Sequence, residues 1–123
     1  MSSSEIITNI DNSIYHLHLK PGQLSTDIIL VGDPDRVDSI TKYFDNIEFV
    51  IQNREFKSVT GSFNNKRISV ISTGIGGSNI DIIINEVDAL FNYDFINQRY
   101  KTKHISLNFI RIGTSGSISE DIK

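Results

Sequence analysis

Continuous apolar runs and alternating positions divide the chain into predicted strands and helices. Residues 27–31 contain an apolar, largely β-branched run, which is typical of a short strand buried on both faces. A helix is predicted over residues 34–43, because Asp33 is a good N-cap and Pro34 fits the first helical position. A strand that ends at Gly32 and leads into a helix points backbone N–H groups outward, which favours an anion-binding turn.

Further strands are predicted where apolar residues cluster between turn residues. Residues 47–52, 55–63 and 67–72 are expected to be strands, and residues 107–112 are expected to be another buried strand. The Asn-Asn pair at 64–65 suits a tight hairpin, because asparagine tolerates positive φ.

The remaining segments are a second helix, an N-terminal arm and a polar excursion. Residues 79–91 are expected to form the helix, and residues 13–19 alternate as in a half-buried strand or extended arm. Residues 92–106 are polar and charged, so a surface segment that is loose or partly helical is expected. The helix stripe comprises Ile80, Ile83, Ile84, Val87 and Leu90, and one face of the arm comprises Tyr15, Leu17 and Leu19.

Small-residue loops follow three of the predicted strands. One begins at Gly32, and the others span residues 74–78 and 113–116. In an open α/β sheet, ligands bind beyond the carboxyl ends of the strands. The sequence therefore predicts an α/β protein with its site at these three loops.

Length and composition exclude several classes of function. The chain has 123 residues, enough for one domain, and its net charge of -3 provides no basic face for nucleic acid. It has no cysteine, which excludes disulfides and thiolate metal sites. No apolar run approaches the roughly 20 residues of a membrane span, and the start lacks a secretory signal pattern. A cytoplasmic protein is therefore expected.

Arg36 is the unusual residue of the first predicted helix. A cation in the first turn opposes the helix macrodipole, whereas Asp33 and Asp35 suit it. An anion bound between Arg36 and the turn at Gly32 would explain the arrangement. The alternative is a capped turn from strand to helix with no ligand.

Arg111 interrupts a run of large apolar residues near the end of the last predicted strand. We expect it to be buried, and a buried guanidinium needs a partner because an unpaired buried charge is costly. One interpretation is a structural ion pair with a carboxylate. The other is an oxyanion held by Arg111 and by Thr114 with its neighbouring N–H groups, since a fork of donors matches phosphate geometry.

The glycine-rich segment 73–79 also permits a dinucleotide-binding interpretation, because it follows a strand and precedes a helix. However, Asn79 stands where the third glycine belongs. An acidic residue that binds the ribose is expected about 20 residues further on, and Asp94 is the nearest candidate. A tight turn that lets helix and strand pack closely is favoured. A nicotinamide-dependent dehydrogenase remains a third hypothesis.

Five motifs, in a fixed order, carry a resemblance to a known family. They lie at residues 14–17 (IYHL), 31–37 (VGDPDRV), 53–56 (NREF), 72–77 (STGIGG) and 111–116 (RIGTSG). With them the chain resembles the N-terminal half of the nucleoside phosphorylase-I family, and within it the uridine phosphorylases. The resemblance implies an α/β fold with a mixed central β-sheet flanked by helices. It also implies that residues 1–123 are the N-terminal part of a single, here incomplete, nucleoside phosphorylase domain.

The resemblance further implies reversible phosphorolysis, in which inorganic phosphate attacks the anomeric carbon of a nucleoside, uridine here, and the base leaves. His16 of a neighbouring subunit would contact the ribose 5′-hydroxyl. The phosphate would be bound by Gly32, Arg36, Arg111, Gly113 and Thr114, and by Arg54 of the neighbouring subunit.

Because the neighbour contributes residues, each site would require a homodimer, and the family is commonly hexameric. No organic cofactor is implied. The resemblance does imply a monovalent cation such as potassium at the dimer interface, held at Glu55, Ile75 and Asn79. Asn79 stands where the family has serine, and its amide oxygen can also coordinate a cation.

The chain departs from the family pattern in two ways. Residues 92–106 are longer than the usual connection, and the family continues past the position of Lys123 with the residues that recognise the base. We therefore expect a chain that supplies the phosphate-binding half of a site and is inactive alone. The alternatives are a purine nucleoside phosphorylase, a related nucleosidase, and a non-catalytic assembly fragment.

Overall fold

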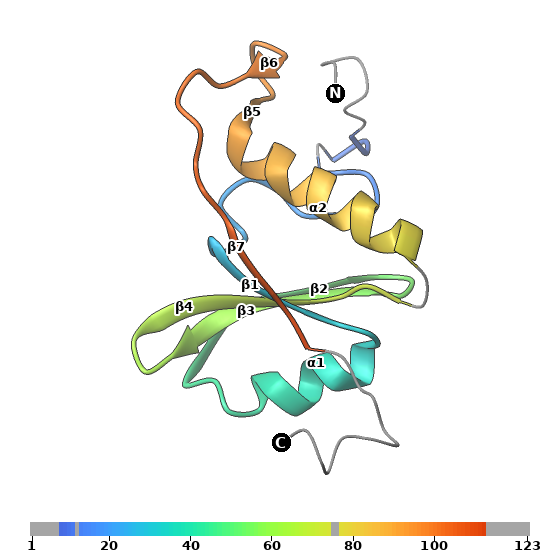
Figure 1. Ribbon diagram of the computed structural model, residues 1–123, viewed down its shortest axis with the longest axis vertical. Coiled ribbons are helices and arrows are strands. Elements are labelled where there is room, and N and C mark those ends of the chain that lie inside the picture. The colour runs from blue at the N-terminus through green and yellow to red at the C-terminus, as the bar shows by residue number, and fades with distance from the viewer. Residues whose placement is uncertain (1–7, 12, 75–76, 113–123) are drawn as a thin grey trace.

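The computed structural model describes residues 8–11, 13–74 and 77–112, and it shows a sheet with a helix on each side (Figure 1). The two helices and the first four strands lie within a few residues of their predicted positions. In chain order the elements are β1 (Asp27–Val31), α1 (Pro34–Thr41), β2 (Asn46–Asn53), β3 (Phe56–Phe63), β4 (Lys66–Ser72), α2 (Gly77–Asn92), β5 (Tyr93–Asp94), β6 (Arg99–Tyr100) and β7 (Asn108–Arg111).

Five strands form one mixed sheet in the order β2-β3-β4-β1-β7. Strand β1 runs parallel to both β4 and β7, whereas β2, β3 and β4 are antiparallel neighbours. The predicted hairpin between β3 and β4 is confirmed, because Asn64 and Asn65 have φ angles of 52° and 66°. The expectation of an α/β fold with a mixed central sheet is also confirmed.

Each face of the sheet has its own apolar cluster, and β1 contributes to both. Ile28 and Leu30 lie in the cluster that contains the buried residues of α2, whereas Val31 packs with Val37 of α1. This arrangement explains why β1 is apolar at consecutive positions. On α2, the predicted apolar stripe is wrong at Ile84, because this residue faces away from the core and is 39% exposed.

A β-bulge distorts β2 where it pairs with β3. The register shifts between Ile47 and Phe49, opposite the buried Gly61. A Cβ at Gly61 would overlap the backbone oxygen of Asn46 and would lie 2.7 Å from Cδ2 of Phe44. The two chain segments can approach this closely because position 61 has no side chain.

The N-terminal arm is a tight turn, not the predicted strand or extended arm. The N–H of Ile14 donates to the carbonyl of Leu19 (2.8 Å), the N–H of His18 donates to that of Ile14 (2.9 Å), and His18 has a φ of 59°. The turn buries Leu17 and Leu19 but leaves Tyr15 48% exposed, so the predicted common face is wrong. Period-2 alternation fails here because the chain reverses direction within it.

Strand β7 is an exposed edge strand, which contradicts the prediction of a buried strand over residues 107–112. Ile110 is 60% exposed, and Asn108 and Arg111 are exposed as well. Within the described residues, β7 pairs with β1 on one side and with no strand on the other. An apolar sequence therefore does not ensure burial at the edge of a sheet.

Residues 92–106 are more ordered than predicted, because they contain the hairpin of β5 and β6. Tyr93 is buried and pairs with Tyr100 in register. The hairpin extends from the end of α2, at the opposite end of the molecule from α1 (Figure 1). Among the residues that the structure describes, no helix is long and apolar enough to cross a membrane.

Candidate functional site

The carboxyl ends of β1, β4 and β7, which run parallel to one another, lie together and form the carboxyl edge of the sheet. The N–H of Thr73 donates to the carbonyl of Val31 (2.8 Å), and the N–H of Ile112 donates to that of Leu30 (2.8 Å). The segments that follow β1, β4 and β7 therefore leave the sheet together. This is the edge at which ligands bind in open α/β sheets.

The turn between β1 and α1 has the geometry that the sequence predicts. Asp33 is extended, with φ -137° and ψ 162°, and its Oδ1 accepts a hydrogen bond from the N–H of Arg36 at 3.0 Å. Pro34 occupies the first position of the helix. A Cβ at the half-buried Gly32 would meet no atom of the described residues within 4 Å, so these residues leave the space beside this backbone open.

Arg36 lies in the first turn of α1, is half-buried, and forms no ion pair with any described residue. By contrast, Arg67 pairs with Glu48 at 3.1 Å. Asp33 and Asp35 lie just before Arg36 in the sequence, yet neither carboxylate pairs with its guanidinium. No described carboxylate therefore neutralises the charge of Arg36.

Arg111 ends β7 and lies in register beside Leu30 of β1. It is exposed, so the prediction of a buried guanidinium is wrong; the reason is that β7 is an edge strand. Within the described part of the chain, Arg111 has no acidic partner, so the interpretation as a structural ion pair finds no support there.

Arg54 lies in the turn between β2 and β3, as predicted, and has a φ of 56°. Its side chain is exposed and takes part in no ion pair with the described residues. The turn directs this residue toward a cavity of about 440 Å³. The cavity is lined by Asn9, Tyr15, His16, His18, Asn53, Arg54, Glu55, Phe56, Asn79 and Ile82.

This cavity brings together four of the predicted site residues, His16, Arg54, Glu55 and Asn79, from three separate segments of the chain. Its lining does not include Gly32, Arg36 or Arg111. The predicted residues thus form two groups in one protomer: one at the carboxyl edge of the parallel strands, and one in the cavity.

Glu55 and Asn79 lie close together beside Gly74. Nδ2 of Asn79 donates to Oε2 of Glu55 at 3.3 Å. A Cβ at Gly74, which has a φ of 74°, would lie 2.7 Å from Cγ of Glu55 and 2.9 Å from Nδ2 of Asn79. A carboxylate and an amide oxygen are suitable ligands for a hard cation. Ile75, Gly113 and Thr114 are also predicted site residues, but they lie outside the described residues.

A fit to a transition metal is poorer. Among the described residues, no three His, Cys, Asp or Glu side chains gather closely enough to hold a metal ion. To coordinate a cation, Asn79 would have to turn its amide oxygen toward the position where its nitrogen now meets Glu55.

His16 is held from two sides, and sequence reasoning missed both holding residues. Glu86 of α2 accepts from the backbone N–H of His16 and of Leu17, and Asn53 donates to the His16 carbonyl at 2.8 Å. The sequence did contain a signal for Glu86. It lies three residues after Ile83, beside the apolar stripe of the helix, and a carboxylate buried there requires hydrogen-bond donors. No comparable signal marks Asn53.

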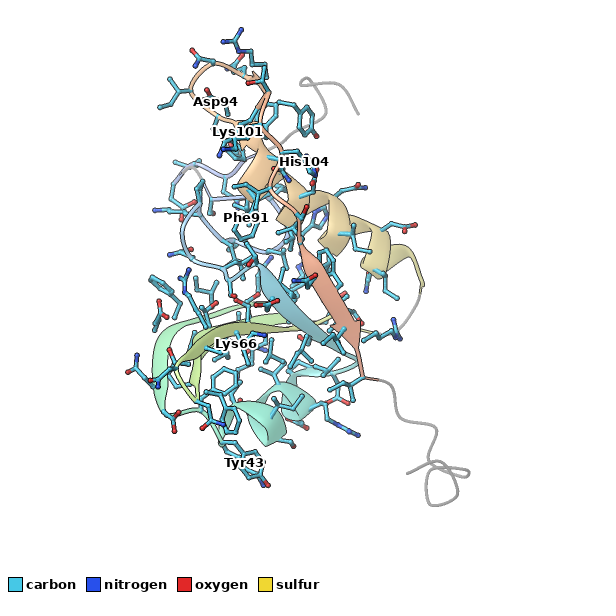
Figure 2. The ribbon with its side chains drawn as sticks, turned by 60° about the vertical axis from the view of Figure 1, so that its left-hand side comes forward. Tyr43, Lys66, Phe91, Asp94, Lys101 and His104 are labelled. Atoms are coloured by element: carbon cyan, nitrogen blue, oxygen red, sulfur yellow. The ribbon has the colours of Figure 1, made fainter. Side chains whose placement is uncertain are left out.

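Asp94 does not act as the ribose partner that a dinucleotide site would need. It is in the β5–β6 hairpin at the C-terminal end of α2 (Figure 2), whereas Thr73 and Gly74 of the glycine-rich segment precede the N-terminal end of that helix. The N–H and side-chain amide of Asn97 donate to its carboxylate, and these hydrogen bonds lower the pKa of Asp94. Asp94 therefore stabilises the hairpin turn.

The family model described as the phosphorylase superfamily matches residues 26–123. The chain belongs to this superfamily. The match includes the edge formed by β1, β4 and β7, and both helices.

Relatives in the phosphorylase superfamily carry two kinds of name. A uridine phosphorylase of Haemophilus influenzae is 38% identical over 113 residues, which cover 90% of this chain and 39% of that protein. A DeoD-type purine nucleoside phosphorylase of Bacillus velezensis is 33% identical over 109 residues, which cover 88% of this chain and 41% of that protein.

A solved structure shows the same fold. The nucleoside phosphorylase of Trypanosoma brucei, described as showing uridine phosphorylase activity, aligns with a TM-score of 0.80 and 34% identity. The alignment covers 89% of this chain and 38% of that one. The chain thus spans about two fifths of the length of the proteins it matches.

Proposed function

We propose that this chain forms part of an enzyme that reversibly cleaves uridine with inorganic phosphate, giving uracil and ribose 1-phosphate. A phosphate oxygen would form a bond to C1′ of the ribose while the bond from C1′ to N1 of the base breaks. The electron pair would leave with the base, which takes up a proton. One observation carries the proposal: in a chain of the phosphorylase superfamily, Gly32, Arg36 and Arg111 all lie at the carboxyl ends of the neighbouring parallel strands β1 and β7.

The proposed phosphate site uses two arginines for which the described part of the chain offers no acidic partner. Arg36 and Arg111 have no acidic partner among the described residues, and the space beside Gly32 is open. At an effective dielectric constant of about 20, one close charge pair contributes roughly 4 kcal/mol before desolvation. The arginines would hold the phosphate in line with C1′ and stabilise the developing charge, with Gly113 and Thr114 completing the site.

We also propose that Arg54 and His16 serve the site of a neighbouring protomer. The support is that they line a cavity that includes none of Gly32, Arg36 and Arg111. In a homodimer, Arg54 of one protomer would reach the phosphate of the other, and His16 would reach the ribose 5′-hydroxyl. A hexamer would consist of three such dimers.

A monovalent cation such as potassium would bind at Glu55, Ile75 and Asn79. The support is the proximity of Glu55 to Asn79 beside the loop that follows β4. The cation would fix the edge of the cavity where two protomers meet, and it would take no part in bond breaking.

The base would be recognised by segments other than this chain. The chain matches about two fifths of the length of its relatives, so we propose that it supplies the phosphate-binding half of the site and is inactive by itself. We further propose that the enzyme acts in the cytoplasm, in pyrimidine salvage, where nucleosides and phosphate are both available.

The test is a cleavage assay of the full-length protein and of the isolated 123-residue chain, with uridine or inosine, with and without phosphate. We expect phosphate-dependent release of uracil by the full-length protein and no turnover by the chain alone. If the base is released from inosine only, the substrate is a purine nucleoside and not uridine. The 33% identity to a purine nucleoside phosphorylase supports this alternative. Cleavage without phosphate would indicate a nucleosidase, and no cleavage of any nucleoside would indicate an assembly role.

A further inference from the structure

Glu86 of α2 is hydrogen-bonded to the N-terminal turn and is not a solvent-exposed carboxylate. It lies between Ile83 and Leu90 on the apolar stripe of α2, and its side chain is 13% exposed. Its oxygens accept from the backbone N–H groups of His16 (3.1 Å) and Leu17 (3.0 Å). One of them also lies 2.6 Å from Nδ1 of the His16 ring.

The turn that carries His16 is anchored a second time by Asn53. Nδ2 of Asn53 donates to the carbonyl of His16 at 2.8 Å, and Asn53 directly precedes Arg54. The ring of His16 also packs edge-on against Tyr15 and Phe56, with centroid separations of 4.8 Å and 6.1 Å. His16 therefore has little freedom to turn relative to Arg54.

We propose that Glu86 is a positioning residue that fixes the protonation pattern of the His16 ring. A carboxylate only accepts hydrogen bonds, so the nitrogen 2.6 Å from it, Nδ1, must carry the proton. In a neutral imidazole the other nitrogen is then an acceptor. Glu86 thus holds the neutral form of His16 with N–H at Nδ1 and with a lone pair at Nε2.

The free lone pair defines the class of ligand. His16 lines the cavity with a side chain that is 40% exposed, and no described residue is hydrogen-bonded to its Nε2. With a lone pair at Nε2, the His16 ring can bind a hydroxyl group that donates a hydrogen bond, such as a sugar hydroxyl. It does not bind a carboxylate or another group that only accepts. The identity of that hydroxyl rests on the proposed function, whereas the state of the ring does not.

The first test is spectroscopic and needs no substrate. Long-range ¹H–¹⁵N correlation on the full-length protein labelled at histidine distinguishes the two tautomers, at about two pH units above the ordinary histidine pKa of about 6.5. We expect His16 with its proton on Nδ1, whereas free histidine prefers Nε2. A His16 protonated on Nε2, or on both nitrogens, would overturn the proposal. This result is independent of turnover, so it separates failure of the proposal from failure of the proposed function.

The second test compares Glu86→Gln with Asp81→Asn, which makes the same charge change at an exposed position of the same helix. In Glu86→Gln we expect His16 to shift toward the Nε2 tautomer and the KM for nucleoside to rise about tenfold or more, with the KM for phosphate unchanged. Asp81→Asn should match the wild type in all three measurements. If Glu86→Gln shifts neither the tautomer nor the nucleoside KM, Glu86 only caps the turn, and the proposal fails. The wild-type spectrum remains decisive even if the variant does not fold.

Discussion

Gly32 and Gly61 show how two glycines in one chain serve different purposes. Gly61 is enclosed, because a Cβ there would overlap a backbone oxygen across the β-bulge. Gly32 has open space on the side where its Cβ would stand, so packing does not require glycine there. Under the proposed function, the absence of a side chain at Gly32 would instead let an anion approach its N–H group.

Replacing Gly32 by alanine should separate binding from stability. Because nothing lies within 4 Å of the added Cβ, we expect the free energy of unfolding to stay unchanged or to rise by about 0.4–1 kcal/mol. If the methyl group blocks a hydrogen bond from N–H to phosphate, the KM for phosphate should rise about tenfold or more. Thermal unfolding and steady-state kinetics measure the two effects. A variant with a wild-type KM for phosphate would remove Gly32 from the site.

Residue types and local order predicted the candidate site better than burial did. The Asp33 cap is confirmed, and it was predicted from the N-cap preference of aspartate, which depends on neighbours in sequence. The choice of Arg36 as a site residue, made from helix electrostatics, stays a prediction. The burial of Arg111 was predicted wrongly, because burial depends on which strand lies at the edge of the sheet. Asn53 was missed because its contact to His16 joins segments that are distant in sequence.

Among the elements, those with strong local signals were predicted and those defined by tertiary contacts were not. The cap of α1 and the asparagine hairpin at 64–65 depend on local backbone chemistry, and both are confirmed. The N-terminal turn alternates like a strand but closes on itself through the bond from Ile14 to Leu19. The strands of the β5–β6 hairpin have only two residues each, so neither period of hydrophobicity identifies them.

The β-bulge of β2 indicates that a side chain at position 61 would lower the stability of the fold, independently of the candidate site. In Gly61→Ala, β2 or β3 must shift to relieve the contact with the Asn46 oxygen, so we expect a loss of about 1–3 kcal/mol of stability. Chemical denaturation measures this loss. As a control, Gly32→Ala should not show it. Equal stability of the two variants would mean that β2 and β3 yield at the bulge without cost.

At the scale of the whole molecule, the proposed function assigns the two groups of site residues to different protomers of a homodimer. The cavity with His16 and Arg54 does not include Gly32, Arg36 or Arg111. One protomer would therefore hold phosphate with its own arginines and complete its site with residues from its neighbour. This arrangement makes complementation between inactive variants possible.

Mixing Arg36→Ala with Arg54→Ala protein should restore activity that neither variant has alone. In a mixed dimer, one site would carry both substitutions and the other would carry neither, because each site takes the two arginines from different protomers. After unfolding and refolding of an equal mixture, about a quarter of the sites should be intact, by random pairing in two-fold dimers. A mixture no more active than the separate variants would mean that both arginines act within one protomer.

Direct titration of phosphate into the full-length protein, by calorimetry, tests the central claim that Arg36 and Arg111, at the carboxyl ends of the parallel strands, hold this anion. The account predicts that Arg36→Ala and Arg111→Ala each weaken binding about tenfold or more, since a hydrogen bond to a charged group contributes about 1.5–3 kcal/mol. Arg99→Ala, on the distant β5–β6 hairpin, should bind like the wild type. Phosphate binding that is absent in the wild type, or equally strong in all four proteins, would contradict the account.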